Sequence, residues 1–432
     1  MSYPHDHTTA LLSPTVRGLE PSPTVATNER CEQLRAEGRE IFKLGLGQSP
    51  FPVPPSVVEA LRAHAHRREY MAVKGLWALR EEVSAHHRRR LGISVHPDHV
   101  LIGPGSKELM FLLQVVFAGE LLLPTPAWVS YEPQARIVGR GVRLLQTRIE
   151  DEYRLLPEDF ERALARDPQR PRVLILNDPS NPTGVSYDDD HLARLAEIAG
   201  RHGVILLADE IYSDLRFTGE HRSIARHLPQ GTIVSGGLSK WCGAGGWRLG
   251  TFAAPPSLGW LIEAMAAVAS ETFTSTSAPI QMAAIRAFQG GTDLELYLRD
   301  ARRILAALGG WITARLRRAD LRVCEAAGGF YLFPDFSAHA AALAARGIHS
   351  SDALCRQLLE DTGVATLPGS VFGRPPEELT LRLAFVDFDG ARALTAVEHR
   401  PQAEPLDDAW LTEHCGAVVA AIERLTRWLA AG

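Results

Sequence analysis

Residues 173–184, Val-Leu-Ile-Leu-Asn-Asp-Pro-Ser-Asn-Pro-Thr-Gly, join a short apolar run to a polar turn. The runs 204–207 (Val-Ile-Leu-Leu) and 232–234 (Thr-Ile-Val) are also largely apolar, and they end at Ala208-Asp209 and at Ser235-Gly236-Gly237. Such runs are typical of strands buried on both faces of a parallel sheet. The residues from Asp188 to Gly203 show helical spacing, with acidic residues at the start and a glycine at the end. The pattern predicts a β-α-β unit in an α/β fold with helices on both faces of the sheet.

The same alternation extends outward from this unit, from about Ser56 to Phe252. After Pro279 a long stretch has helical spacing, which we expect to be broken at Gly309-Gly310. Near the start, Asn28 is a candidate cap for a helix that continues through Leu34. We therefore expect three parts: an arm and helix (1–45) that belong with the small domain, a large domain (46–292), and a small α+β domain (293–432) with an insertion near 398–408.

Composition excludes several classes of protein. The chain has 432 residues and a net charge of -5 without a basic patch, so we expect no nucleic-acid partner. No apolar run is long enough for a membrane span, and no secretory signal is recognisable. Five cysteines without a CxxC pair favour a reducing compartment, so we expect a cytoplasmic protein. The pattern His5-Asp6-His7 is interpreted as a polar terminus, and no metal site is predicted.

Polar side chains collect where the apolar runs end. Asn177 and Asn181 follow the first run, Asp209 and Tyr212 follow the second, and Lys240 follows the third. Ligands of open α/β sheets bind beyond the carboxyl ends of the strands. The sequence therefore predicts an amide, a carboxylate, a phenol and an amine in one crevice.

Three segments in this order carry a family resemblance. They are Asn177 to Gly184 (N-x-P-x-N-P-T-G), Asp209 to Tyr212 (D-E-x-Y), and Ser239 to Gly250 (S-K-x(6)-G-W-R-x-G). Together they resemble the class I/II aminotransferase family of fold-type I enzymes, which use pyridoxal 5′-phosphate (PLP). The resemblance covers nearly the whole chain and implies a mostly parallel, seven-stranded sheet flanked by helices, plus a smaller α+β domain.

The resemblance implies catalytic roles for three residues. Lys240 would hold PLP as a Schiff base and then move a proton at the substrate. Asp209 would pair with the pyridine nitrogen and keep it protonated. Tyr212, together with Asn181, would donate hydrogen bonds to the phenolic oxygen of the ring.

Further cofactor contacts follow from the same resemblance. Arg248 would bind the phosphate through its planar fork. The turn before residue 106 opens a helix whose free N–H groups suit a phosphate, and Trp128 matches the aromatic that stacks on the ring. Tyr70 matches a tyrosine that reaches the phosphate of a partner subunit, which implies a homodimer with shared sites. The remaining predicted cofactor-binding residues are Gly105, Ser106, Lys107 and Ser239.

The resemblance also implies that three residues bind the substrate. Arg382 matches an arginine that grips the α-carboxylate of the substrate, and Gly47 and Asn181 would lie beside the same carboxylate. The chain departs from the family pattern at one phosphate contact. Gly237 stands where many relatives have a serine, and the hydroxyl of Ser235 could take the place of the missing one.

The implied reaction is transfer of an amino group from an α-amino acid to a 2-oxo acid. Relatives with the same motifs carry out β-elimination, cyclopropane-forming elimination or amino acid oxidation, so these reactions remain alternatives. A regulatory protein is disfavoured because the arm before Gly45 is too short for a DNA-binding module. A dehydrogenase is disfavoured because no G-x-G-x-x-G motif opens a β-α unit. The side chain of the donor stays open.

Overall fold

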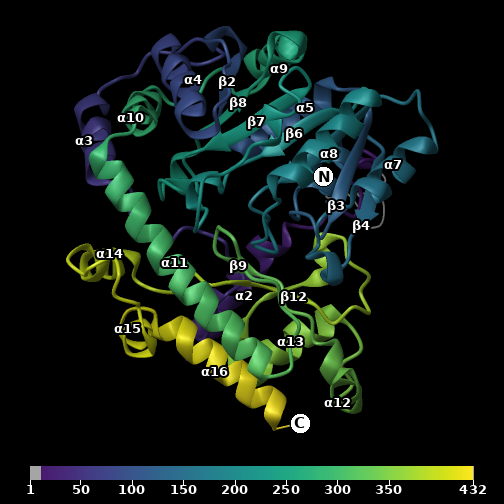
Figure 1. The fold of residues 1–432 in the computed structure, drawn as a ribbon, viewed down its shortest axis with the longest axis vertical. Coiled ribbons are helices and arrows are strands. Elements are labelled where there is room, and N and C mark those ends of the chain that lie inside the picture. The colour runs from purple at the N-terminus through teal and green to yellow at the C-terminus, as the bar shows by residue number, and fades with distance from the viewer. Residues whose placement is uncertain (1–10, 432) are drawn as a thin grey trace, which may run out of the picture.

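The computed structural model describes residues 11–431 and is built around one seven-stranded sheet (Figure 1). The strand order is β2-β8-β7-β6-β5-β3-β4, and β8 is the one strand that runs opposite to the other six. The predicted mostly parallel sheet is thus confirmed. The bounds are β2 Val100–Gly103, β3 Glu120–Thr125, β4 Val142–Gln146, β5 Arg172–Asn177, β6 Ile205–Asp209, β7 Thr232–Gly237 and β8 Gly250–Ala253.

The apolar runs form strands because both faces of the sheet are covered. Leu174 and Leu176 of β5 pack in one buried cluster with residues of α7 (Pro157–Ala165) and α8 (Asp189–Arg201). Val173 and Ile175 point the other way, into a cluster with residues of α5 (Ser106–Val116) and α9 (Gly259–Thr272). A strand between two helical layers has no polar face, which explains its unbroken apolar sequence.

The helix after β5 begins as the sequence predicted. The side chain of Asp188 accepts a hydrogen bond of 2.8 Å from the backbone N–H of His191. This contact satisfies one of the free N–H groups in the first turn of α8.

Three more helices flank the end of the sheet at β2 and β8. They are α3 (Pro55–His64), α4 (Trp77–Leu91) and α10 (Ala278–Gln289), and α6 (Tyr131–Ile137) lies beside α5.

The C-terminal part of the chain forms a second layer below the large sheet in Figure 1. Its three-stranded antiparallel sheet has the order β11-β12-β9, and the short strand β1 pairs with β10. The bounds are β1 Phe42–Lys43, β9 Tyr331–Leu332, β10 Val364–Ala365, β11 Leu367–Pro368 and β12 Leu381–Ala384, with helices α12 Ala340–Ala345, α13 Ser351–Thr362, α14 Gly390–Glu398, α15 Asp408–His414 and α16 Gly416–Ala430.

Two helices differ from the prediction. Helix α2 spans Pro23–Ala36 and begins before Asn28, because Pro23 suits the first helical position, where no N–H is needed. Helix α11 runs without a break over Thr292–Arg318. Its Gly309 lies against the ring of Phe385, which a Cβ atom would approach to 3.3 Å. The glycine therefore allows close packing instead of ending the helix.

The insertion near 398–408 is a loop fastened to α11. The guanidinium of Arg303 donates hydrogen bonds to the backbone carbonyls of Arg400, Pro401 and Glu404 at 3.0, 2.7 and 2.5 Å.

Residues 5–7 lie outside the described part of the chain. Within residues 11–431, no helix combines the length and apolar character needed to cross a membrane.

Candidate active site

The predicted site residues gather at the carboxyl ends of β5, β6 and β7. Asn177 and Asp209 end neighbouring strands in register, and the Asn177 amide donates a 2.7 Å hydrogen bond to the Asp209 carbonyl. The backbone N–H of Asn181 donates to the side chain of Asn177 at 2.6 Å, which folds the polar turn back over the strand end. Lys240 follows β7 by three residues. These side chains therefore meet at the end of the sheet to which the strand-end rule points.

Asp209 is a buried carboxylate with one free oxygen. It is 4% exposed, and its Oδ2 accepts a hydrogen bond of 2.5 Å from the hydroxyl of Tyr131. Its Oδ1 has no hydrogen-bond partner within the described residues. Burial raises the pKa of Asp209 to about 6, against the opposing effects of the Tyr131 hydrogen bond, the nearby backbone N–H of Ile211 and the charge of Lys240. A buried acceptor without a donor fits a cationic N–H group on a ligand.

Lys240 faces the same crevice. Its Nζ donates a 2.7 Å hydrogen bond to the carbonyl of Gly47. Burial lowers the pKa of Lys240 to about 8, helped by the positive charges of Arg382 and Arg248 and opposed by Asp209. An amine with this pKa is partly neutral near pH 7 and can act as a nucleophile.

The start of α5 and Arg248 form an anion cradle. Gly105 has a φ of +91°, and a Cβ there would lie 2.1 Å from a guanidinium nitrogen of Arg248. Arg248 also donates to the carbonyls of Gly245 at 2.9 Å and Pro104 at 3.2 Å. Glycine at position 105 therefore lets the guanidinium approach the first turn of α5, which begins at Ser106. Free N–H groups beside an arginine suit a phosphate.

Trp128 and Lys107 lie on another side of the crevice. The Nζ of Lys107 lies 5.2 Å from the centroid of the Trp128 ring. The Trp128 ring meets the ring of Tyr131 edge to face at 5.2 Å, which places it next to the Asp209 partner. Burial lowers the pKa of Lys107, and the neighbouring charge of Arg248 acts in the same direction.

Arg382, on β12, reaches the crevice from the C-terminal part. It is 1% exposed and donates to the Asn181 side-chain oxygen at 3.0 Å and to the Gly45 carbonyl at 2.5 Å. Its guanidinium lies 4.7 Å from the ring centroid of Tyr331 and 5.1 Å from that of Phe372. A planar fork held between two rings suits a carboxylate.

Gly47 must be glycine at this point of the chain. A Cβ atom there would lie 1.8 Å from the hydroxyl oxygen of Tyr331. That hydroxyl is also 2.9 Å from the hydroxyl of Tyr212, whose pKa burial and the nearby Tyr331 raise well above its usual value. Gly47, Tyr212 and Lys240 thus share one wall of the crevice.

Sequence reasoning missed Tyr131 and Tyr331 as site residues. Tyr131 follows Trp128 by three residues and starts α6, a spacing that could have suggested a second aromatic at the same place. Tyr331 follows Gly328 and Gly329, but its contacts with Tyr212 come from a segment more than a hundred residues away. No local pattern indicates that contact.

Two predicted residues lie apart from the crevice of this chain. Tyr70 is 89% exposed. The Ser235 hydroxyl lines a cavity with His87, Asp214 and Trp241, which are not among the predicted phosphate-binding residues, so it does not stand in for the missing serine. Gly237 has a φ of +151°, and a Cβ there would lie 2.6 Å from the carbonyl of Leu249, which explains the glycine.

Ser239 is half-buried in the turn that precedes Lys240. The residues brought together fit PLP: a free buried oxygen on Asp209 for a ring N–H, an amine on Lys240 for an aldehyde, and the cradle at Arg248 for a phosphate.

Comparisons with known proteins agree with this fit. Residues 39–396 match the family model described as aminotransferase class I and II. The aspartate aminotransferase of Geobacillus stearothermophilus is 33% identical over 373 residues, which cover 84% of this chain and 92% of that protein. The asparagine–oxo-acid transaminase of Streptococcus mutans is 31% identical, with coverage of 84% and 92%.

Solved structures show the same fold. The aspartate aminotransferase from Thermus thermophilus with maleate superposes with a TM-score of 0.82 at 29% identity, covering 96% of this chain and 99% of that chain.

Proposed function

The chain belongs to the class I and II aminotransferase family, and on that premise we propose that it transfers the amino group of a dicarboxylic α-amino acid, with aspartate as the first candidate, to a 2-oxo acid. The observation that carries the proposal is the pairing in one crevice of a partly neutral amine, Lys240, with a buried carboxylate, Asp209. The names of the relatives and the cations around that crevice support a substrate with two carboxylates.

The cofactor is PLP, which supplies an electron sink for the bond electrons released at the substrate Cα. We assign Lys240 to hold it covalently and to carry the proton that leaves Cα. Asp209 would hold a proton on the ring nitrogen, a role that its unpaired Oδ1 supports. Trp128 would cover one face of the ring, and Asn181 and Tyr212 would donate hydrogen bonds to its phenolic oxygen.

The phosphate is assigned to the cradle described above. Arg248 supplies the charge, and Gly105, Ser106 and Ser239 line the start of α5 and the turn before Lys240. Tyr70 is assigned to the phosphate of a second copy of the chain, a role that its exposed position supports. The proposal therefore includes a homodimer with shared sites.

Both carboxylates of the donor have candidate partners. Arg382 is assigned to the α-carboxylate, with Asn181 and Gly47 beside it. Lys107 is assigned to the second carboxylate, because its amine lies over Trp128 and no described carboxylate forms an ion pair with it. This assignment replaces the contact with the cofactor expected for Lys107 from the sequence.

Two wider proposals complete the description. The division into a large domain (46–292) and a small domain (293–432) that includes the arm is supported by the pairing of β1 with β10. A cytoplasmic location is supported by the free thiols of all five cysteines.

A donor panel tests the proposed function. The purified enzyme is given aspartate, glutamate, alanine or phenylalanine with 2-oxoglutarate or pyruvate, and the new oxo acid is measured. We expect aspartate to give the highest kcat/KM, and Lys107→Gln to raise the KM for aspartate about tenfold while leaving the KM for alanine unchanged. Absence of oxo acid from every pair contradicts transamination, and release of ammonia without an acceptor favours elimination instead.

A further inference from the structure

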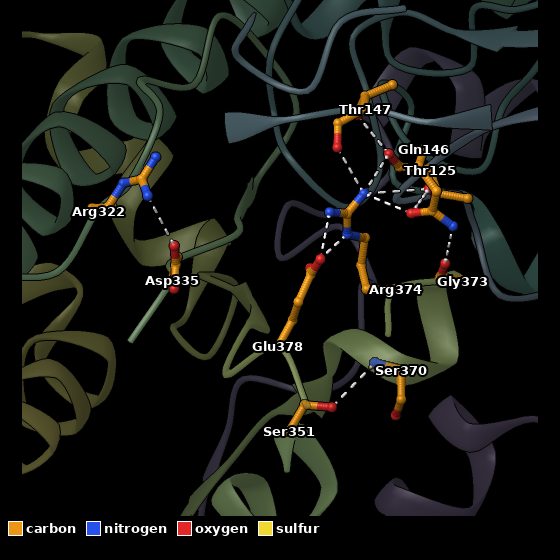
Figure 2. Close-up of polar contacts among 10 residues, drawn as sticks. All are labelled: Thr125, Gln146, Thr147, Arg322, Asp335, Ser351, Ser370, Gly373, Arg374 and Glu378. Carbon is orange, nitrogen blue, oxygen red and sulfur yellow. Dashed lines mark hydrogen bonds and ion pairs between the residues drawn. The ribbon is translucent and has the colours of Figure 1, made fainter. Parts of the chain in front are cut away.

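Residues 369–378, here called the strap, cross from the C-terminal part to the large sheet. The strap lies between β11 and β12, and the backbone N–H of Ser370 donates to the hydroxyl of Ser351 on α13 at 3.2 Å. Its middle, at Gly373 and Arg374, reaches the carboxyl ends of β3 and β4 (Figure 2). The strap therefore links the two layers of the molecule beside the candidate active site.

Arg374 is the main polar contact of the strap with the large sheet. It is 9% exposed, and its NH1 donates to the carbonyl of Thr147 at 2.8 Å, to the side chain of Gln146 at 3.0 Å and to the carbonyl of Thr125 at 3.3 Å (Figure 2). Its Nε and NH2 each donate to a carboxylate oxygen of Glu378 at 2.8 Å. The fork on Glu378 fixes the orientation of the guanidinium, and the remaining nitrogen connects it to two strands.

Backbone contacts bring the strap close to the same strands. The carbonyl of Phe372 accepts a 2.9 Å hydrogen bond from the N–H of Ala127, and the carbonyl of Gly373 accepts one of 3.1 Å from the side chain of Gln146. Gly373 has a φ of +81°, and a Cβ there would lie 2.9 Å from the Thr125 methyl group. Only glycine permits this approach without displacing Thr125.

The strap touches two groups already assigned to the site. Phe372 presents its ring to the guanidinium of Arg382 at 5.1 Å and is fully buried. Ala127, bonded to the strap, is the residue before Trp128. Arg374 follows Phe372 by two residues, so the point that fixes the strap also fixes the ring behind Arg382 and the backbone next to Trp128.

From these contacts we propose that Arg374 is a positioning residue for substrate binding. It holds the carboxylate-binding Arg382, on one layer, at a fixed place relative to Trp128, on the other. A change at Arg374 alters where the substrate carboxylate is held and leaves the groups that move protons in place. The proposal rests on the proposed function, because it names what Arg374 does for the same site.

Arg322 offers a matched control. It lines the same open cavity as Arg374. Arg322 pairs with Asp335 at 3.6 Å and with Glu150 of the large-sheet layer, so it also links the two layers. Its side chain is half exposed, and its ion-pair partners, Glu150 and Asp335, lie outside the strap.

The experiment compares Arg374→Gln with Arg322→Gln in the holoenzyme. We expect Arg374→Gln to raise the KM for the amino acid donor about tenfold with less than about a threefold change in kcat. We also expect faster hydrogen–deuterium exchange in peptides covering 124–130 and 369–374, both with and without added cofactor. Arg322→Gln should leave the KM and the exchange of these peptides at wild-type values.

A second variant keeps the proposal testable if Arg374→Gln folds poorly. Arg374→Lys retains the charge but lacks the fork, so we expect a KM between those of the wild type and the glutamine variant. Equal KM values in the Arg374 and Arg322 variants, or a loss of thermal stability without a change in KM, overturn the proposal. Wild-type activity with the donor panel tests the proposed function separately.

Discussion

Two buried carboxylates lie at opposite ends of the large sheet and have different surroundings. Glu120 begins β3 and contacts the guanidinium groups of Arg143 at 3.0 Å and Arg172 at 3.3 Å. Asp209 ends β6 with one oxygen bonded to Tyr131 and the other unpaired. Pairing a buried charge inside the protein serves the fold, whereas leaving an acceptor free lowers stability. The comparison shows which end of the sheet is reserved for a ligand.

The largest effect is expected from Lys240→Ala, at the end of the sheet where Asp209 has an unpaired oxygen. Removal of the amine should lower kcat at least about 10⁴-fold, because no other described lysine replaces the Nζ beside Gly47. Single-turnover kinetics measure the loss. Borohydride reduction with peptide mass analysis should show cofactor attached to residue 240 in the wild type only, and attachment elsewhere would contradict the assignment.

The second-largest effect is expected from Asp209→Asn, which should change activity and stability in opposite directions. Asp209→Asn should lower kcat about 10³-fold and raise the stability of the cofactor-free protein by about 1–2 kcal/mol near pH 7. The folded pKa of about 6 exceeds the ordinary value of 3.8, so the ionised carboxylate weakens the fold as the pH rises through this range. Thermal unfolding at several pH values should show the gain above pH 6 and its loss near pH 4. A variant less stable than the wild type at pH 7 would reverse this interpretation.

A change at Glu120, whose carboxylate is paired with arginines, should lower stability and leave activity unchanged. Glu120→Gln leaves the buried guanidinium of Arg172 and the half-buried guanidinium of Arg143 without their counter-charge, and we expect it to cost about 3 kcal/mol of stability. Because Glu120 lies at the far end of the strands, kcat/KM should stay within about twofold of the wild type. Denaturant unfolding and steady-state kinetics on the same preparation measure both. A large loss of kcat in a folded Glu120→Gln variant would contradict the view that Glu120 serves stability and Asp209 serves the ligand.

The smallest effect concerns the pH dependence of PLP uptake by the cofactor-free protein. Only the neutral amine attacks an aldehyde, and the pKa of Lys240 is about 8. The uptake rate should therefore rise about tenfold per pH unit below pH 8 and become level above it. Rapid mixing across this range measures the profile. A rate independent of pH below 8 is not compatible with a buried amine of this pKa.

The sequence predicted the parts of the site that depend on strand ends. Asp209 and Lys240 were found because each comes after a short, mostly apolar run, and such runs mark the interior of a parallel sheet. Alternate side chains of β5 face the helical layers on opposite sides of the sheet, so every position of the run 173–176 is buried and apolar.

The remaining contacts depend on distant parts of the chain. Arg374 bonds to carbonyl groups more than two hundred residues away, and carbonyl acceptors leave no trace in a sequence. Tyr331 meets Tyr212 across two layers, for the same reason. Gly309 was expected to end a helix because local propensity disfavours glycine, but packing against Phe385 decided the outcome.

The unbroken course of α11 has a mechanical consequence. With 27 residues it is a rod about 40 Å long, and it starts directly after Gly290 and Gly291, both with positive φ. A tilt of about 6° at that start displaces the far end by about 4 Å, because a stiff rod multiplies a small rotation by its length. Slight differences in angle between two crystal forms would accordingly be most visible near Arg318 and α16, and least visible around the root of the rod.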